Sequence, residues 1–125
     1  MYFLDSNICL YYLRNRYPPL SRKLMATSPD KIKIPSIVEA EIFTGVEKGA
    51  QITREMWEEF FAPFDHDAAR KYALIRAHLE QNGMVIGPND LVIAATVLAH
   101  NGILVSHNTG EFKRIPDLLL EDWTA

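Results

Sequence analysis

The chain opens with Met1-Tyr2-Phe3-Leu4-Asp5-Ser6-Asn7-Ile8, and this stretch decides the fold into which the rest of the sequence fits. Residues 2–4 form a short apolar run, which predicts a buried strand. Asp5 ends the run, and the polar residues 6–7 are suited to cap a helix over residues 8–13. The opening therefore predicts a strand whose carboxyl end delivers an acid to the start of a helix.

Strand and helix patterns alternate along the remaining chain. We expect further strands at residues 32–34, 63–64 and 103–105. We expect further helices over residues 20–26, from residue 37, over 52–61, over 66–82 and from residues 87–89 to about 100. Short, continuously apolar strands separated by helices are typical of a parallel sheet covered on both faces. No repeat or linker interrupts the pattern, so we predict one α/β domain over residues 1–125, with the sheet between two helix layers.

Composition excludes several classes of protein. The 125 residues are 48% hydrophobic and 23% charged, which is ordinary for one globular domain. The single cysteine, Cys9, excludes an internal disulfide framework and a multi-cysteine zinc site. The longest apolar run, residues 91–99, is too short for a membrane span, and the N-terminus does not resemble a signal peptide. We therefore expect a cytoplasmic protein with no membrane partner.

The net charge of −3 conceals two oppositely charged regions. Residues 6–38 carry six basic side chains and one acidic one, whereas residues 39–67 carry eight acidic and two basic ones. The basic region also holds tyrosines 11, 12 and 17 beside Arg14 and Arg16. Such residues can stack on and neutralise a nucleic acid, but solvated helix faces and tyrosines packed in a core would give the same pattern.

Three acids stand where their neighbours are apolar. Asp5 follows the first strand, Glu41 lies one turn into the helix after the second strand, and Asp90 lies in the first turn of an apolar helix. Ligands of such sheets bind outside the carboxyl ends of the strands. Gathered carboxylates repel one another unless a cation lies among them, and Mg²⁺ or Mn²⁺ takes oxygen ligands. This arrangement predicts metal-assisted hydrolysis of a phosphodiester.

Each acid also has a simpler interpretation. Asp5 can serve only as a helix cap, and Asp90 only as an acid that interacts with the helix dipole. Glu39 rather than Glu41 can be the inward acid of its helix. The four histidines (66, 78, 100 and 107) show no metal-ligand spacing, so we expect incidental surface roles for them.

Four blocks occur in an order that is typical of a known family. They are Met1 to Ile8; Pro35-Ser36 with Glu41 and Gly45-Val46-Glu47-Lys48; Ala68-Ala69 to Glu80 followed by Ile86-Gly87-Pro88-Asn89-Asp90-Leu91; and Leu104-Val105-Ser106-His107-Asn108-Thr109 with Glu111-Phe112 and Glu121-Asp122-Trp123. Together they resemble the PIN-domain proteins, in particular the VapC-type toxins of bacterial toxin–antitoxin pairs. The resemblance extends over essentially the whole chain.

The resemblance implies a PIN-like fold and a metal-dependent endoribonuclease that uses Mg²⁺ or Mn²⁺ on structured RNA, often tRNA. It also implies a homodimer, neutralised by a cognate antitoxin whose C-terminal segment covers the active site. At matching positions, Asp5 and Asp90 correspond to metal-binding acids and Glu41 to the second-block acid, which we also count as a metal ligand. Asn7 and Ser106 correspond to polar residues that line the site, and we add Arg14 from the basic region.

Many PIN domains carry a fourth acid where this chain has Asn108, and the nearby Glu111 can supply that acid instead. We therefore expect a metal held by Asp5 and Asp90, with Glu41 completing the acidic pocket. Asn108, Glu111 and Ser106 would orient the water or the metal.

Two rival functions remain. A PIN-fold binding module with weakened catalysis is suggested by the amide at Asn108. A haloacid-dehalogenase-type phosphatase also begins with an acid after its first strand, but its second aspartate would fall at Asn7.

Overall fold

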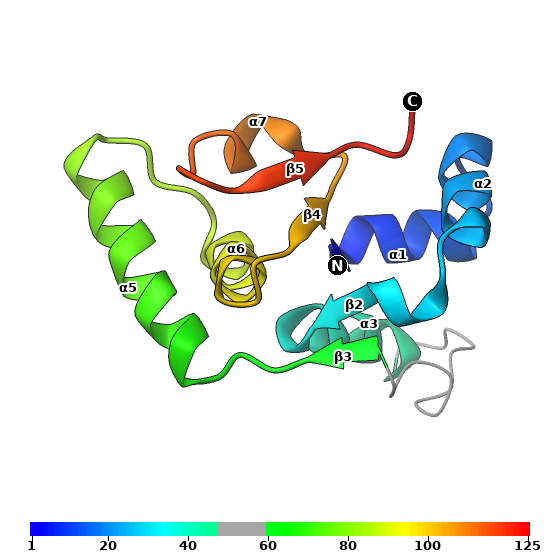
Figure 1. Ribbon diagram of the computed structural model, residues 1–125, viewed down its shortest axis with the longest axis horizontal. Coiled ribbons are helices and arrows are strands. Elements are labelled where there is room, and N and C mark those ends of the chain that lie inside the picture. Colours follow the sequence, from blue (N-terminus) through cyan, green and yellow to red (C-terminus); the bar gives the residue numbers. More distant parts are fainter. Residues whose placement is uncertain (48–59) are drawn as a thin grey trace.

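Figure 1 shows the computed structural model, which describes residues 1–47 and 60–125. Its strands are β1 (Tyr2–Leu4), β2 (Ile32–Pro35), β3 (Phe61–Ala62), β4 (Ile103–Val105) and β5 (Leu119–Glu121). They form a five-stranded sheet in the order β3-β2-β1-β4-β5, and every neighbouring pair is parallel. The opening strand is central, because Tyr2 is in register with Ile32 of β2 and with Ile103 of β4. The predicted parallel sheet is confirmed.

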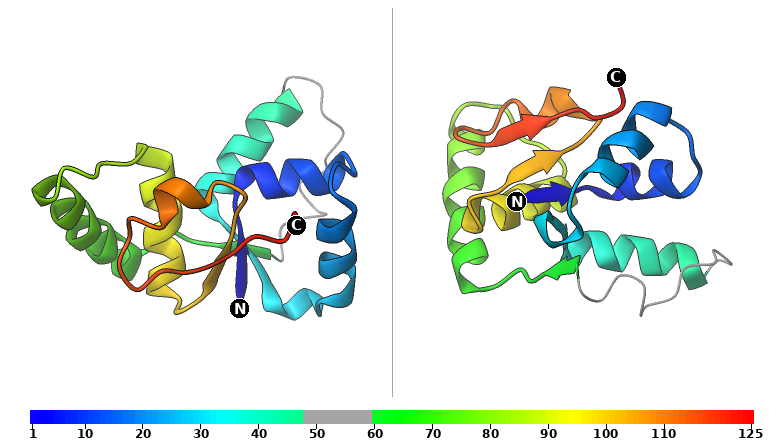
Figure 2. Two further views of the ribbon diagram at one scale, coloured as in Figure 1. Left: turned by 90° about the horizontal axis from the view of Figure 1, so that it is seen from above. Right: turned by 45° about the vertical axis from the view of Figure 1, so that its right-hand side comes forward.

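Helices cover the sheet on both faces. They are α1 (Ser6–Leu13), α2 (Pro18–Ala26), α3 (Ser36–Glu47), α5 (His66–Gln81), α6 (Pro88–Ala99) and α7 (Thr109–Phe112), with a 3₁₀ turn at Pro29–Lys31. The left view of Figure 2 shows α1 and α2 on one side of the strands and α5 and α6 on the other. The predicted α/β sandwich is therefore present.

The strand order reverses its direction between β1 and β4, and this switch point at the carboxyl ends of the two strands is named the crevice here. The chain moves outward from β1 through β2 to β3 and then returns to β4 and β5 on the other side of β1. Because crossovers are right-handed, the two directions put their helices on opposite faces. The connections that follow β1 and β4 therefore diverge, and this point of divergence is where open parallel sheets bind ligands.

Local interactions explain where the helices begin. The Asp5 carboxylate caps α1 by accepting a hydrogen bond from the backbone N–H of Ile8 at 3.0 Å. Asp65 caps α5 in the same way through the N–H of Ala68. Proline occupies the first turn of α2 and of α6, where its missing N–H costs no hydrogen bond. These caps agree with the helix starts expected from sequence to within about two residues.

A continuous apolar core joins the sheet to its helices. Phe3 and Leu4 of β1 and Leu104 and Val105 of β4 are all buried. Helix α6 is buried along most of its length, as its apolar composition predicted, and its Ala94, Ala95 and Val97 are fully inaccessible. Burial of this kind stabilises each large apolar side chain by about 1.5–3 kcal/mol.

The structure corrects two expectations around residue 60. The strand expected at residues 63–64 lies instead at Phe61–Ala62, where it pairs with Ile34 and Pro35. Pro63 has no N–H to donate to a ladder, which explains why the strand ends before it. Most of the helix expected over 52–61 lies outside the described residues, and its last residue, Phe61, belongs to β3.

Two elements near the C-terminus were not expected. Strand β5 and helix α7 occupy the segment after β4. The apolar run Leu118-Leu119-Leu120 was the available signal for β5, and Asp117 forms the preceding turn with a φ of 66°. Across the part of the chain that the structure describes, no helix is long and apolar enough to cross a membrane.

Gly102 provides a test of the packing around β1. A Cβ at this position would overlap the ring of Phe3, which is only 1% exposed and has no room to move. We expect Gly102→Ala to lower the free energy of unfolding by about 1–3 kcal/mol, measured by urea denaturation. Gly110→Ala is the matched control, because its Cβ meets no atom within 4 Å and alanine favours the helix. Equal stability of the Gly102 variant and the wild type would contradict the packing described for β1.

Candidate active site

Asp5 directly follows β1, at the start of the connection on the β1 side of the crevice. Its side chain is only 6% exposed, and Oδ1 accepts the hydrogen bond from Ile8 N–H. Burial raises the pKa of Asp5, while hydrogen bonds from the Ser106 side chain and from Ile8 lower it. The carboxylate thus caps the helix and also occupies the strand end. The two interpretations of Asp5 from sequence do not exclude each other.

Ser106 links the ends of β1 and β4. It follows β4, is fully buried, and its hydroxyl hydrogen-bonds to the Asp5 side chain. The same Oγ accepts a hydrogen bond from the backbone N–H of Asn108 at 3.0 Å. Asn108 itself is exposed and stands at the N-cap position of α7 without a capping hydrogen bond from its side chain. Its amide is free to turn toward a bound group.

Asp90 and Glu111 form an acid pair across the crevice. Asp90 is in the first turn of α6 and Glu111 in the first turn of α7. Burial raises the pKa of Asp90 to about 6, aided by a hydrogen bond to Glu111 and by the negative charges of Glu111, Asp5 and Glu41. Because the neighbouring carboxylates repel a further negative charge, Asp90 keeps its proton to a higher pH than a free aspartate does. The structure places Glu111 beside Asp90.

Glu41 is close to the other acids but is not enclosed. Its charge raises the pKa of both Asp5 and Asp90. Its apolar neighbours in sequence do not enclose it, because Val38 and Ile42 are buried in the core while Glu41 is exposed. Glu39 is half-buried. The helical period separates these side chains onto different faces of α3.

The two remaining candidates lie on α1. Asn7 is exposed in the first turn, next to Asp5. Arg14 follows the last residue of the helix, about 12 Å from the Asp5 end by the helical rise. The structure therefore does not place Arg14 with the acids.

The donor set suits a hard divalent cation that keeps much of its water. Within residues 1–47 and 60–125, no three acidic, histidine or cysteine side chains form a ready-made metal cage. Mg²⁺ does not need such a cage, since it is usually held by one or two carboxylates and several waters. Burial is the main cause of the raised pKa values of Asp5 and Asp90, and neighbouring carboxylates add to it, so a cation beside them would be stabilised. These residues therefore fit a cation held through Asp5 and Asp90.

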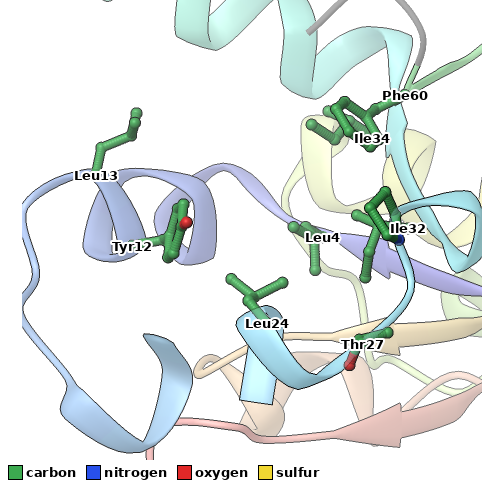
Figure 3. A pocket seen from close by; sticks show the side chains of 9 residues that line it. Leu4, Tyr12, Leu13, Leu24, Thr27, Ile32, Ile34 and Phe60 are labelled. Atoms are coloured by element: carbon green, nitrogen blue, oxygen red, sulfur yellow. The ribbon is translucent and has the colours of Figure 1, made fainter. Parts of the chain in front are cut away.

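The apolar pocket in Figure 3 is unsuited to the same chemistry. It has a volume of about 290 Å³ and lies between α1, α2 and β2, where Leu4, Leu24 and Ile34 are among its lining residues. None of the residues that line it is charged. It can accept an apolar group but has nothing to stabilise a phosphodiester.

His107, for which we expected an incidental surface role, lies close enough to Asp5 to act on it. It follows Ser106, and its charge lowers the pKa of Asp5. Its ring lies 5.6 Å from that of Tyr17 and 6.3 Å from that of Tyr11. Its position two residues after the end of β4 is the feature of the sequence that indicates this proximity.

The chain is similar to known proteins both in sequence and in fold. The PIN domain family matches residues 2–118. The chain is 38% identical to "Ribonuclease VapC2" of Rickettsia felis and 32% identical to "tRNA(fMet)-specific endonuclease VapC" of Shigella flexneri, with 98% of each chain covered. Its fold matches the crystal structure of VapBC2 from Rickettsia felis bound to a promoter DNA fragment, with a TM-score of 0.82 and 36% identity over 98% of both chains.

The acid pair predicts an unusual pH dependence of stability. The pKa of Asp90 is about 6 in the folded protein against 3.8 in an unfolded chain, so the folded state binds the extra proton. Stability of the metal-free protein should therefore fall as pH rises from about 4 through about 6. After allowance for solvent screening, we expect Asp90→Asn to be more stable than wild type by about 1 kcal/mol at pH 8, with no gain at pH 4.

Urea denaturation at both pH values in a chelator measures this difference. Asp67→Asn is the control, because Asp67 is an exposed acid in the first turn of α5 and its charge favours the helix. The control should show no gain at pH 8. An Asp90→Asn protein less stable than wild type at pH 8 would contradict the repulsion among the acids.

Proposed function

The chain belongs to the PIN-domain family, among the VapC ribonucleases, and we propose that it is the toxin of a toxin–antitoxin pair that hydrolyses RNA phosphodiester bonds with a divalent cation. The single observation that carries this proposal is the acidic crevice between β1 and β4. There Asp5, Asp90, Glu41 and Glu111 act on one another electrostatically. Acids in this arrangement favour a cation and the phosphate that accompanies it.

The surroundings of each acid indicate its role in binding the cation. Asp5 is the pre-positioned metal ligand, because Ile8 and Ser106 hold its carboxylate before anything binds. Asp90 is the second ligand, and Glu41 adds negative charge from the exposed side. Mg²⁺ or Mn²⁺, when bound, supplies an activated water and neutralises charge on the phosphoryl oxygens.

Glu111 and the polar residues after β4 complete the site. Glu111 hydrogen-bonds to Asp90 and adds to the negative charge that a bound cation would neutralise. Ser106 holds both Asp5 and the backbone of Asn108, which leaves the Asn108 amide and the nearby Asn7 to orient a water or a phosphate oxygen.

Structured RNA such as tRNA is the proposed substrate. Exposed Arg14, Arg16, Arg22 and Lys23 lie on or beside α1 and α2, so they are available for backbone phosphates. A relative named as a tRNA-specific endonuclease supports this choice. Arg14 then acts at the periphery of the site and not among the acids.

The partner proposed for this chain is a cognate antitoxin. The Rickettsia felis VapBC2 structure, which this chain resembles over 98% of its length, supports that pairing. We propose that the antitoxin's C-terminal segment covers the acidic crevice, and that the toxin is a cytoplasmic homodimer built from one PIN domain per chain. The antitoxin would block the same carboxylates that hold the cation.

Replacing Asp5 tests the catalytic proposal. We expect Asp5→Ala to abolish metal-dependent RNA cleavage and growth inhibition on expression, with a loss of at least roughly 100-fold in rate. Asp5→Asn should lose activity equally while keeping the helix cap, since asparagine caps as well as aspartate. Its thermal midpoint should therefore stay close to that of the wild type.

Asp67→Asn, a substitution of a distant exposed acid, should cleave RNA normally. If purified Asp5→Asn cut RNA as fast as wild type, the mechanism would be wrong. A wild type that binds a protein partner tightly but cleaves no RNA would instead favour the binding module.

Cation binding should also be visible without RNA. Because the cation binds only the folded state, Mn²⁺ at about 100 times its Kd should raise the free energy of unfolding by about 2.7 kcal/mol. The rise should be much smaller in Asp90→Asn, which keeps the fold but loses a charged ligand. Thermal unfolding with MnCl₂, against KCl at the same ionic strength, measures the effect. Equal shifts in the two proteins would contradict a role for Asp90 in holding the metal.

A further inference from the structure

Four side chains form an aromatic cluster at the end of α1, defined here as Tyr11, Arg16, Tyr17 and His107. Asn15 takes a left-handed φ of 50°, which turns the chain so that the backbone N–H of Arg16 donates to the carbonyl of Tyr11 at 3.0 Å. The Arg16 guanidinium then lies 5.3 Å from the ring centroid of Tyr11 and 5.7 Å from that of Tyr17. The turn thus builds a cation–π stack from neighbouring residues.

His107 adds a ring to this cluster from the other side of the crevice. Its Nδ1 lies 3.1 Å from Asp122 Oδ2 and 2.9 Å from Thr124 Oγ1, so the C-terminal segment fixes the orientation of the ring. Its side chain is 48% exposed, and Arg16 is exposed as well. Tyr11 and Tyr17 are half-buried behind them. The outer surface of the cluster is therefore a histidine ring and a guanidinium, supported by two tyrosines.

The cluster borders the acids. His107 directly follows Ser106, whose hydroxyl contacts the Asp5 carboxylate, and the charge of His107 acts on Asp5. The same region is rich in positive charge, since residues 6–29 contain four basic side chains and no acidic one. A polyanion whose phosphate reached the acids would extend across this surface.

We propose that the aromatic cluster stacks an unpaired nucleobase of the RNA, next to the phosphate that is cleaved. This inference rests on the proposed ribonuclease function and adds a feature of its substrate: a base that is not paired in a helix. Planar rings and guanidinium groups stack on any base whose face is free, whereas bases inside a duplex have no free face. Phosphate binding alone would require only the basic side chains and would not require the aromatic rings.

The rival explanation is that His107 only anchors the C-terminal segment. That role depends on its ring nitrogen, which contacts Asp122 and Thr124. Stacking depends instead on the aromatic face. His107→Phe keeps the face and removes the nitrogen, while His107→Leu removes both, so this pair of variants separates the two roles.

The probe is a single-stranded RNA of about 12 nucleotides with one fluorescent 2-aminopurine, compared with a fully paired duplex of the same length. Binding is measured in a chelator, so that no cleavage occurs. We expect the wild type to quench the single strand and not the duplex. His107→Leu should bind the single strand about tenfold more weakly or worse and lose the quenching, whereas His107→Phe should stay within about threefold of wild type.

His78→Leu is the matched control, because it removes an exposed histidine from α5, which lies on the other side of the strands from α1 (Figure 2). It should bind and quench as the wild type does. Thermal midpoints of the two His107 variants should be equal, which shows that any difference between them comes from the ring face.

Equal impairment of the two His107 variants, normal binding by His107→Leu, or quenching of the duplex would overturn the inference. Cleavage of total RNA with Mn²⁺ is measured in parallel. A wild type that quenches the single strand but cleaves nothing contradicts the ribonuclease and leaves the stacking supported. A wild type that cleaves while His107→Leu keeps the same KM contradicts the stacking alone.

Discussion

Mutual repulsion among carboxylates at the carboxyl ends of β1 and β4 is the constraint on which the rest of this structure depends. Asp5 is held almost without exposure to solvent, and burial raises the pKa of Asp90 to about 6, with further contributions from Glu111, Asp5 and Glu41. A carboxylate whose pKa is raised in this way would gain free energy by moving into solvent if the backbone allowed it. The backbone does not allow it, because the strand ends and helix starts that carry the acids are anchored in the apolar core.

The acids are carried by the parts of the chain that can move least. β1 pairs on both sides, and α6 is buried along most of its length, so neither Asp5 nor Asp90 can retreat. Glu41 projects from α3 into solvent and is less constrained. The site therefore combines fixed ligands with a more adaptable rim, which suits a cation that keeps several waters. The same rim continues into the aromatic cluster and its positive charges.

Much of the architecture could be predicted from sequence because the signals were local. The apolar run before Asp5, the proline at the start of α6 and the apolar run of β4 each describe a few consecutive residues. Prediction from the sequence failed where the position of a residue depends on contacts with residues far away in the chain. Strand β5 is short and half exposed, so its pattern is weak, and β3 was displaced by two residues because its ladder partners on β2 set its position. Glu41 was judged by its neighbours in sequence, whereas the helical period turned it outward.

The sequence by itself determined the pairing of a strand end with a helix cap at Asp5, since the hydrogen bond that defines it spans only three residues. It also determined the order of blocks that identifies the family. Only the tertiary structure decided that Asp90 meets Glu111, that Ser106 holds Asp5, and that His107 completes a cluster begun at Tyr11. These contacts join the starts of different helices around one strand end. No periodicity encodes them, because they arise from the order in which β1, β4 and β5 lie side by side.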